Sequence, residues 1–315
     1  MLAGSSEKPI TFFTAVPTIY TRLMSTHTEL PREVQDVART AISPDHLRLN
    51  ISGSAALPTP IKSAWEDLSK GNILLERYGM TEIGMAISCG LDFKSRVNGS
   101  VGWPLPSVEV RLVDLDTHEV IGLGDEIDAE GRLREGEIHV KGPTVFSEYW
   151  NNEAATSKEF VDDPDGNGKW FKTGDVASRQ MVPEAGNNSQ PWAKGPMYFI
   201  KGRRSVDIIK VGAEKVSALE VERELLSLPQ IAEAAVVGLD SEQWGQKVVA
   251  IVVLRESQKN TGRGGKSWGV MDMRRALKDR LGAVKLPSEM KLVDVIPRNA
   301  MGKINKKTLV KNLYG

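Results

Sequence analysis

Short apolar runs alternate with amphipathic stretches over the first 75 residues. Residues 10–13 predict a buried strand, and residues 18–24 have the spacing of an amphipathic helix. The alternation then repeats as a strand at 47–51, a helix at 60–68 and a strand at 73–75. Strands that alternate with helices are typical of an α/β sheet. We therefore expect functional residues in the loops that follow these strands.

The pattern changes twice further along the chain. Between residues 101 and 145, short strands broken by Gly and Pro predict an antiparallel β unit. After residue 202 a second α/β pattern begins, with expected elements as follows: a helix at 218–226, strands at 234–239 and 248–254, and a helix at 270–281. We accordingly predict two domains, residues 1–201 and residues 202–315.

Two polar stretches, residues 182–196 and 256–269, are rich in Gly, Ser, Asn, Lys and Arg. Such composition predicts loops without regular structure, and solvated surface insertions are their simplest interpretation.

Composition narrows the class of protein. Hydrophobic residues make up 40% and charged residues 26% of the 315 residues, as in an ordinary globular chain. Because 41 basic residues balance 41 acidic ones, no bulk charge favours nucleic acid or an anionic membrane. The single cysteine, Cys89, cannot form an internal disulfide and suits a reducing intracellular compartment. No run approaches the roughly 18 apolar residues of a membrane span, and the N-terminus lacks a signal or transit pattern.

The run Tyr78-Gly79-Met80-Thr81-Glu82 carries the clearest chemistry. A turn bending at Gly79 lets the backbone approach a phosphate, the Thr81 hydroxyl can donate to that phosphate, and Glu82 can hold a hard cation. A Gly turn followed by Thr-Glu also serves as a plain helix-capping signal. The motif therefore needs support from the rest of the chain.

That support comes from order. The run resembles the nucleotide and Mg²⁺ corner of the adenylate-forming acyl-CoA synthetases, and further motifs of that family follow in the family's order: residues 11–20, 52–58, 136–143, 170–175, 202–203 with 207–212, and 297–304. The shared order argues against coincidence. The resemblance implies an α/β fold in which an incomplete large adenylate-forming domain precedes a small, mobile C-terminal α/β domain.

The resemblance also implies an activity and its cofactors. Members activate a carboxylate with ATP and Mg²⁺ to an acyl-adenylate, release pyrophosphate, and transfer the acyl group to the thiol of coenzyme A. Glu82 would ligate Mg²⁺, Thr81 would contact phosphate, and Lys303 would reach the site for adenylation. The remaining implied positions are Gly53, Ser54, Ala55 and Ala56 against adenine, Tyr78 and Gly79 in the nucleotide turn, Asp175 and Arg203 at the ribose, Ser205 as the hinge, and Gly212 beside the pantetheine arm.

Each assignment has a simpler alternative. Residues 53–56 can be only a strand-exit turn, and Asp175 and Arg203 only surface charges. Lys303, like Lys306 and Lys307 after it, can be an ordinary solvated lysine.

Arg77 suggests which carboxylate is activated. A guanidinium would be costly beside an aliphatic chain but suits a second carboxylate. The surrounding residues resemble malonyl-CoA synthetases, so malonate or methylmalonate is the expected small-molecule partner. The alternatives are that Arg77 pairs with Glu76 or another acid, or that the enzyme activates a monocarboxylate or loads the acyl group onto a carrier protein.

The family's Ser/Thr/Gly-rich phosphate loop has no counterpart before Thr11. We therefore expect the C-terminal portion of a longer enzyme, mitochondrial or cytoplasmic, with an exposed sheet edge that favours aggregation or association with another chain. The second hypothesis is a non-catalytic remnant that holds AMP, acyl-adenylate or coenzyme A.

Overall fold

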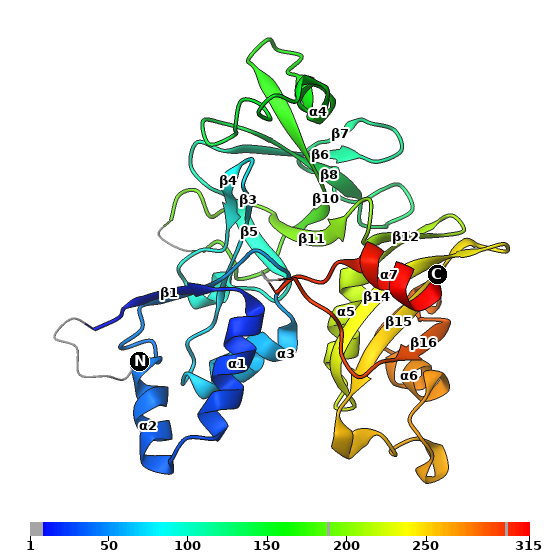
Figure 1. Cartoon of the computed structure of the whole chain (residues 1–315). Helices are drawn as coiled ribbons and strands as arrows, with labels where there is room; N and C mark the ends of the chain where they lie inside the picture. Colours follow the sequence, from blue (N-terminus) through cyan, green and yellow to red (C-terminus); the bar gives the residue numbers. More distant parts are fainter. Residues whose placement is uncertain (1–8, 188–189, 300–301) are drawn as a thin grey trace. The chain divides into compact units, whose positions relative to one another are not determined.

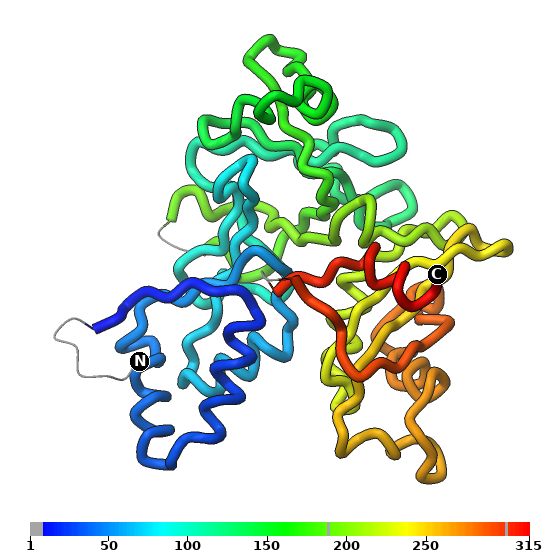
Figure 2. The backbone as a smooth tube through the Cα atoms, in the orientation of Figure 1, coloured from blue at the N-terminus to red at the C-terminus, as the bar shows by residue number. Residues whose placement is uncertain are grey.

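The computed structural model describes residues 9–187, 190–299 and 302–315. The predicted motif at 297–304 includes Ala300 and Met301, which lie outside the described residues. The chain divides into two compact units, Met1–Ile200 and Lys201–Gly315, which are described in turn. Figure 1 shows the elements of each unit, and Figure 2 traces the path of the chain.

The first unit begins with three parallel strands and the helices between them. The strands are β1 Phe12–Ala15, β2 Leu49–Ser52 and β3 Leu75–Met80, and the helices are α1 Pro17–Thr28, α2 Arg32–Ala41 and α3 Thr59–Leu68. Tyr20 and Trp65 are buried between α1 and α3 with ring centroids 4.8 Å apart. The Tyr20 hydroxyl donates to the Ile51 carbonyl at 2.7 Å, which ties the helix layer to the sheet. The α/β alternation predicted for this region is confirmed.

The sheet continues through antiparallel strands. Its described strands follow the order β1-β2-β3-β4-β5-β11-β10-β8-β6-β7, with β9 beside β10. The added elements are β4 Gly84–Ser88, η1 Phe93–Ser95, β5 Ser100–Pro104, β6 Glu109–Asp114, β7 Val120–Ile121, β8 Glu135–Lys141, α4 Glu153–Glu159, β9 Phe160–Asp162, β10 Lys169–Gln180 and β11 Met197–Arg203. The antiparallel unit predicted from the sequence is confirmed. Strand β1 ends the path, so association through this edge stays a prediction.

The prediction that Gly79 forms the bend of a turn is wrong. Strand β3 extends through Met80, and the turn comprises the three residues that follow, closed by the Ile83 N–H donating to the Met80 carbonyl at 3.2 Å. Gly79 lies inside the β3–β4 pairing, where a Cβ would come within 2.1 Å of the Gly84 carbonyl oxygen. Glycine is therefore required by the close approach of two strands.

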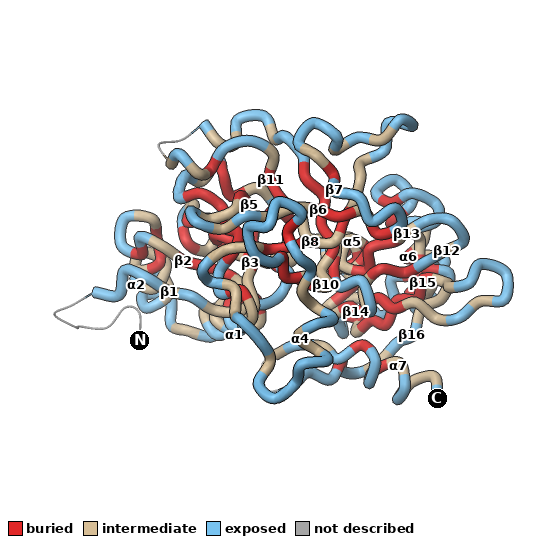
Figure 3. The backbone as a smooth tube through the Cα atoms, turned by 90° about the horizontal axis from the view of Figure 1, so that it is seen from above, coloured by how far each residue is buried: buried red, intermediate tan, exposed pale blue. Residues whose placement is uncertain are grey.

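The second unit is a small sheet with helices on both faces. Its elements are β12 Ile208–Val211, β13 Glu214–Ser217, α5 Ala218–Leu226, β14 Ile231–Ser241, β15 Gly245–Leu254, η2 Glu256–Gln258, η3 Arg263–Gly265, α6 Val270–Leu277, η4 Ala283–Lys285, β16 Glu289–Leu292 and α7 Lys306–Tyr314. Alternate residues of β14 and β15 face opposite ways. Val236 and Ala250 pack in the core with α5 and α6, whereas Val237 and Ile251 pack in the core with Leu309 of α7. Figure 3 shows the middle of each of these strands as buried.

The two polar stretches are more ordered than their composition predicts. The described part of residues 182–196 has no helix or strand, as expected, but its Ala193 is fully buried beside Trp103. Residues 256–269 contain two short 3₁₀ turns, and Trp268 is only 3% exposed in the core of the second unit. Both segments are anchored by apolar side chains, so the prediction of simple solvated insertions is wrong.

Candidate active site

The first link in the site joins strands β3 and β10. The Tyr78 hydroxyl donates to Asp175 Oδ2 at 2.9 Å, although the two residues are 97 positions apart in the sequence. Tyr78 is only 9% exposed, so its ring is fixed in the core while its hydroxyl reaches the carboxylate. The structure thus brings together two residues that the sequence assigned to one nucleotide.

An irregularity in β10 directs Asp175. The pairing of β10 with β8 shifts register between Lys172 and Val176, and Gly174 in this interval has a φ of 73°. The Thr173 hydroxyl oxygen accepts the Asp175 N–H at 3.1 Å. β-Bulges recur next to active sites because they re-aim a side chain. The bulge gives a local reason for the Thr-Gly-Asp sequence.

The second link joins the β3–β4 turn to the segment before α4. The Tyr149 hydroxyl donates to Glu82 Oε1 at 3.0 Å, and the Phe146 N–H donates to the Glu82 carbonyl at 2.8 Å. Thr81 beside it is exposed. No cluster of three or more His, Cys, Asp or Glu suited to a metal occurs in the described residues. A single held carboxylate fits Mg²⁺, which usually keeps several waters and binds one or two carboxylates together with substrate phosphates.

Residues 53–56 lie at the carboxyl end of β2, beside the continuation of β3. Ser52 is paired with Glu76, so β3 extends past the end of β2 and an added Cβ on Gly53 would lie 3.6 Å from the Arg77 carbonyl oxygen. Ser54 has a φ of 65°, and residues 54–56 are exposed. The segment is therefore a strand-exit turn with exposed small side chains. This backbone is compatible with a plain turn and with the predicted wall against adenine.

Arg77 is half-buried, and its side chain bonds a neutral hydroxyl. Its Nε donates to the Ser88 hydroxyl at 3.3 Å, and burial lowers the pKa of its guanidinium. Glu76, which the sequence suggested as a partner, instead forms an ion pair with Lys62 at 2.8 Å. Among the described residues, no acid forms an ion pair with Arg77. The guanidinium remains suited to an anionic ligand.

In the second unit, Lys303 lies in the loop of residues 302–305 that precedes α7. Its N–H donates to Asn299 Oδ1 and its carbonyl accepts the Asn299 N–H, both at 2.9 Å, while the residue itself is exposed. Arg203 and Ser205 lie in an exposed turn that closes when the Asp207 N–H donates to the Arg203 carbonyl at 2.7 Å.

Gly212 lies in the turn between β12 and β13 with a φ of 60°. This left-handed conformation alone favours glycine there. Its N–H donates to the Trp244 carbonyl at 2.7 Å, and the Trp244 side chain is 52% exposed. A place beside a pantetheine arm stays a prediction.

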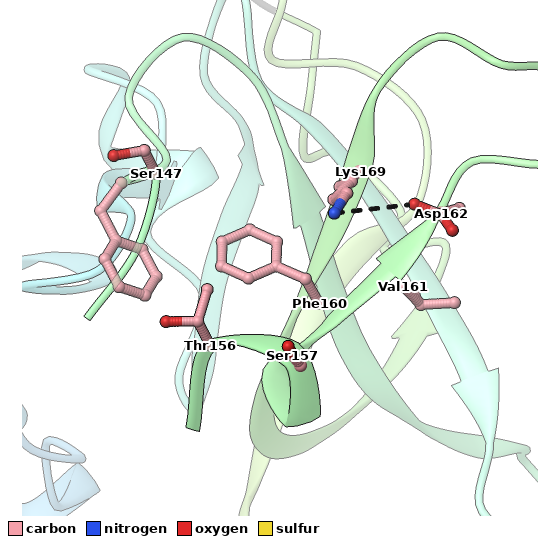
Figure 4. A pocket seen from close by; sticks show the side chains of 8 residues that line it. Ser147, Thr156, Ser157, Phe160, Val161, Asp162 and Lys169 are labelled. Carbon is pink, nitrogen blue, oxygen red and sulfur yellow. Dashed lines mark ion pairs between the residues drawn. The ribbon is translucent and has the colours of Figure 1, made fainter. Parts of the chain in front are cut away.

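A separate cavity of about 570 Å³ is lined by residues of α4, β9 and β10 and of the segment before α4 (Figure 4). Phe146 and Phe160 line its apolar side, and Lys169 and Asp162 form an ion pair of 3.9 Å at its rim. None of the sequence-predicted site residues lines this cavity.

Sequence reasoning missed Tyr149 and misjudged Lys306. Nothing near Tyr149 in the sequence links it to Glu82, 67 positions earlier, because only the fold brings them together. The lysine-rich sequence predicts a solvated Lys306, but this residue is 8% exposed and forms ion pairs with Asp207 and Glu222. The solvated interpretation is wrong for this lysine.

The arrangement can be compared with known proteins. The model of the AMP-binding enzyme family matches residues 2–150, and that of the AMP-binding enzyme C-terminal domain matches residues 220–303. The chain belongs to the AMP-binding enzyme family. The resemblance drawn from the ordered motifs is thereby confirmed.

Individual members of the family are close relatives. A CoA ligase of Gibberella moniliformis is 57% identical over 313 residues, and the mitochondrial malonate–CoA ligase ACSF3 of Mus musculus is 44% identical over 325 residues. Each alignment covers 98% of this chain and 50% of the relative. ATP-bound MatB from Rhodopseudomonas palustris matches in structure with a TM-score of 0.72 and 32% identity, over 97% of this chain and 52% of MatB. The chain thus spans about half the length of these relatives. Its described residues include no helix long and apolar enough to cross a membrane.

Proposed function

We propose that this chain serves an ATP-dependent acid–thiol ligase that forms an acyl-CoA through an acyl-adenylate. The observation that carries the proposal is the hydrogen bond from Tyr78 to Asp175, which joins two motifs that we propose bind the nucleotide. The link between Glu82 and Tyr149 supports it, because it holds a carboxylate for Mg²⁺ on the same β3–β4 hairpin. The family relationship supports the same reaction.

The first step joins two anions, so it needs charge neutralisation and positioning more than a protein nucleophile. A carboxylate oxygen of the substrate attacks the α-phosphorus of ATP, and the bond to pyrophosphate breaks. Asp175 would accept hydrogen bonds from the ribose hydroxyls, and Arg203 would assist it. Thr81 would contact phosphate, and Lys303 would place its ammonium between the carboxylate and the α-phosphate. Mg²⁺ bound at Glu82 would neutralise phosphate charge.

In the second step the thiolate of coenzyme A attacks the acyl carbonyl carbon, and AMP leaves with the electrons of the broken acyl–oxygen bond. We propose that the second unit is the small domain that turns between the steps about Ser205. Gly212, in its left-handed hairpin turn, would then lie beside the pantetheine arm. Residues 53–56 would form the wall against adenine.

The proposed substrate is a short dicarboxylate, malonate or methylmalonate. Arg77 supports this choice, since its guanidinium is half-buried and, among the described residues, its side chain donates a hydrogen bond to the neutral hydroxyl of Ser88. A second substrate carboxylate would supply the charge that this site lacks. The mouse relative, a malonate–CoA ligase, supports the same choice.

The test is mass-spectrometric detection of malonyl-CoA from the purified chain with ATP, Mg²⁺, malonate and coenzyme A. Arg77→Ala is compared with Arg22→Ala, an exposed arginine of α1 that serves as the matched control. A lost charge-assisted hydrogen bond is worth about 1.5–3 kcal/mol, so kcat/KM for malonate should fall about 10- to 100-fold in Arg77→Ala alone.

The other outcomes distinguish the proposed ligase from the alternative hypotheses. Unchanged malonate turnover in Arg77→Ala would reject the dicarboxylate assignment. A folded chain that binds AMP or coenzyme A and forms no product would favour the non-catalytic binding function instead.

A further inference from the structure

Lys306 is a buried charge at the start of the C-terminal helix. Its Nζ lies 2.5 Å from Asp207 Oδ1 and 2.7 Å from Glu222 Oε1, and the three side chains are at most 16% exposed. Lysine is almost never buried unless it is paired. The two carboxylates raise the pKa of Lys306 against the opposing effect of burial, so the ammonium stays charged.

Each carboxylate of this cluster also holds backbone. Asp207 Oδ2 accepts the Arg203 N–H at 3.0 Å, which closes the turn that contains Ser205. Glu222 Oε1 accepts the Val236 N–H at 2.7 Å, which joins α5 to β14. Lys306 therefore connects three segments: the turn at residues 203–207, the helix α5 and the first residue of α7.

A second ion pair lies on the other side of Lys303. Arg298 donates to the Gly302 carbonyl at 3.1 Å and to Glu233 Oε2 on β14 at 2.9 Å. The loop of residues 302–305 is thus fixed on both sides, by Arg298 through the Gly302 carbonyl and by Lys306 three residues after Lys303. Lys303 itself remains exposed between these two anchors.

We infer that Lys306 and Arg298 are positioning residues for Lys303, and that Lys306 couples the Lys303 loop to the turn that contains Ser205. The inference rests on the function proposed above for Lys303 and Ser205. Because one ammonium bonds Asp207, which follows Ser205, and begins the helix after the loop, the loop moves together with the part of the turn that follows Ser205. A rotation about Ser205 then carries Lys303 into or out of the site without loss of its geometry.

The first test measures the tether, meaning the coupling of the Lys303 loop to the turn through Lys306, and needs no activity assay. Hydrogen exchange is followed by mass spectrometry in the whole chain and in Lys306→Met, Arg298→Met and the control Lys307→Met, which changes the exposed neighbour of Lys306. Amides of residues 302 and 303 should exchange on the order of tenfold faster in the first two variants. The Asp207 amide should accelerate in Lys306→Met alone, and the control should match the wild type. Wild-type exchange at residues 302, 303 and 207 in Lys306→Met would overturn the inference.

Lys306→Met leaves two buried carboxylates without their cation and can prevent folding. The triple variant Lys306→Met, Asp207→Asn, Glu222→Gln removes all three charges, so it separates positioning from stability. Faster loop exchange in a triple variant as stable as the wild type would support the tether, and unchanged exchange would overturn it.

The second test separates the two chemical steps. In the triple variant, adenylate formation should slow by about 10- to 100-fold, because small misplacement of a catalytic group has an effect of this size. Conversion of supplied acyl-adenylate and coenzyme A to thioester should be unchanged. Adenylate formation at the wild-type rate despite faster loop exchange would overturn the positioning role. A wild-type chain that forms no adenylate would reject the proposed function, and the exchange result would still decide the tether.

Discussion

The ion pair between Lys62 and Glu76 places two charged side chains in the interior of the first unit. Lys62 on α3 and Glu76 on β3 are 2% and 8% exposed, with Nζ and Oε1 2.8 Å apart. Lys62 Nζ also donates to the Val97 carbonyl at 3.3 Å. Since Glu76 precedes Arg77 on β3, this pair fixes the strand that carries the proposed substrate contact.

We expect Lys62→Met to destabilise the first unit strongly. The variant keeps most of the buried volume but leaves the Glu76 carboxylate uncompensated, which costs about 3–5 kcal/mol. With a urea m-value of about 3 kcal/mol/M, the unfolding midpoint should fall by about 1–2 M. The double variant Lys62→Met, Glu76→Gln has neither charge, so it should recover most of the loss.

The assay is urea unfolding followed by segment-resolved hydrogen exchange. Peptides from residues 59–80 report the first unit, and peptides from residues 248–254 of β15 serve as an internal control that should not change. A midpoint shift below about 0.3 M in Lys62→Met would refute the buried-charge argument. A double variant as unstable as the single one would refute it as well, because packing rather than charge would then account for the loss.

Three further predictions concern stability. Gly79→Ala would place a Cβ within 2.1 Å of the Gly84 carbonyl, so thermal melting should show a loss of about 1–3 kcal/mol. Burial, with Arg111 and Lys172 nearby, lowers the pKa of His139 to about 4. The contribution of neutral His139 to stability is therefore fully present above pH 6.5. Up to about 3 kcal/mol of the free energy of unfolding is lost as the pH falls from 6.5 through 4. In acid-unfolding curves, His139→Gln should reduce this dependence on pH. Trp268→Ala should cost the second unit about 3–5 kcal/mol in urea unfolding, and a loss below about 1 kcal/mol would contradict its core role.

Elements with a strong local period were predictable. The helix expected at 218–226 matches α5, Ala218–Leu226, because apolar residues at helical spacing coincide there with Ser217 as the N-cap. The helix α2 is not among the predicted elements, although Val34, Val37 and Ala38 have helical spacing, and none of its residues is buried. The strand expected at 73–75 begins at Leu75 and runs to Met80, since pairing with β4 outweighs the local turn signal of Gly79.

Sequence motifs identified residues of the candidate site, but they could not predict the contacts between those residues. Ordered motifs named Tyr78, Asp175 and Glu82, but their spatial relation depends on strand register and on the bulge in β10. Tyr149 had no signal because its hydrogen bond to Glu82 spans 67 residues. The sequence signal at Lys306 is misleading, because a lysine-rich tail predicts a solvated side chain. Only the fold places two carboxylates around this ammonium.

The direction of Arg77 follows from strand geometry. Residues of a strand alternate between faces, so Arg77 and Glu76 point opposite ways. Arg77 is directly paired with Ser88 in the antiparallel β3–β4 register, and its side chain bonds that serine, whereas Glu76 turns toward Lys62 on α3. A slip of one residue in β3 would exchange the two positions and bury the guanidinium against a lysine. The same ion pair that stabilises the first unit therefore keeps Arg77 on the face where a substrate carboxylate would meet it.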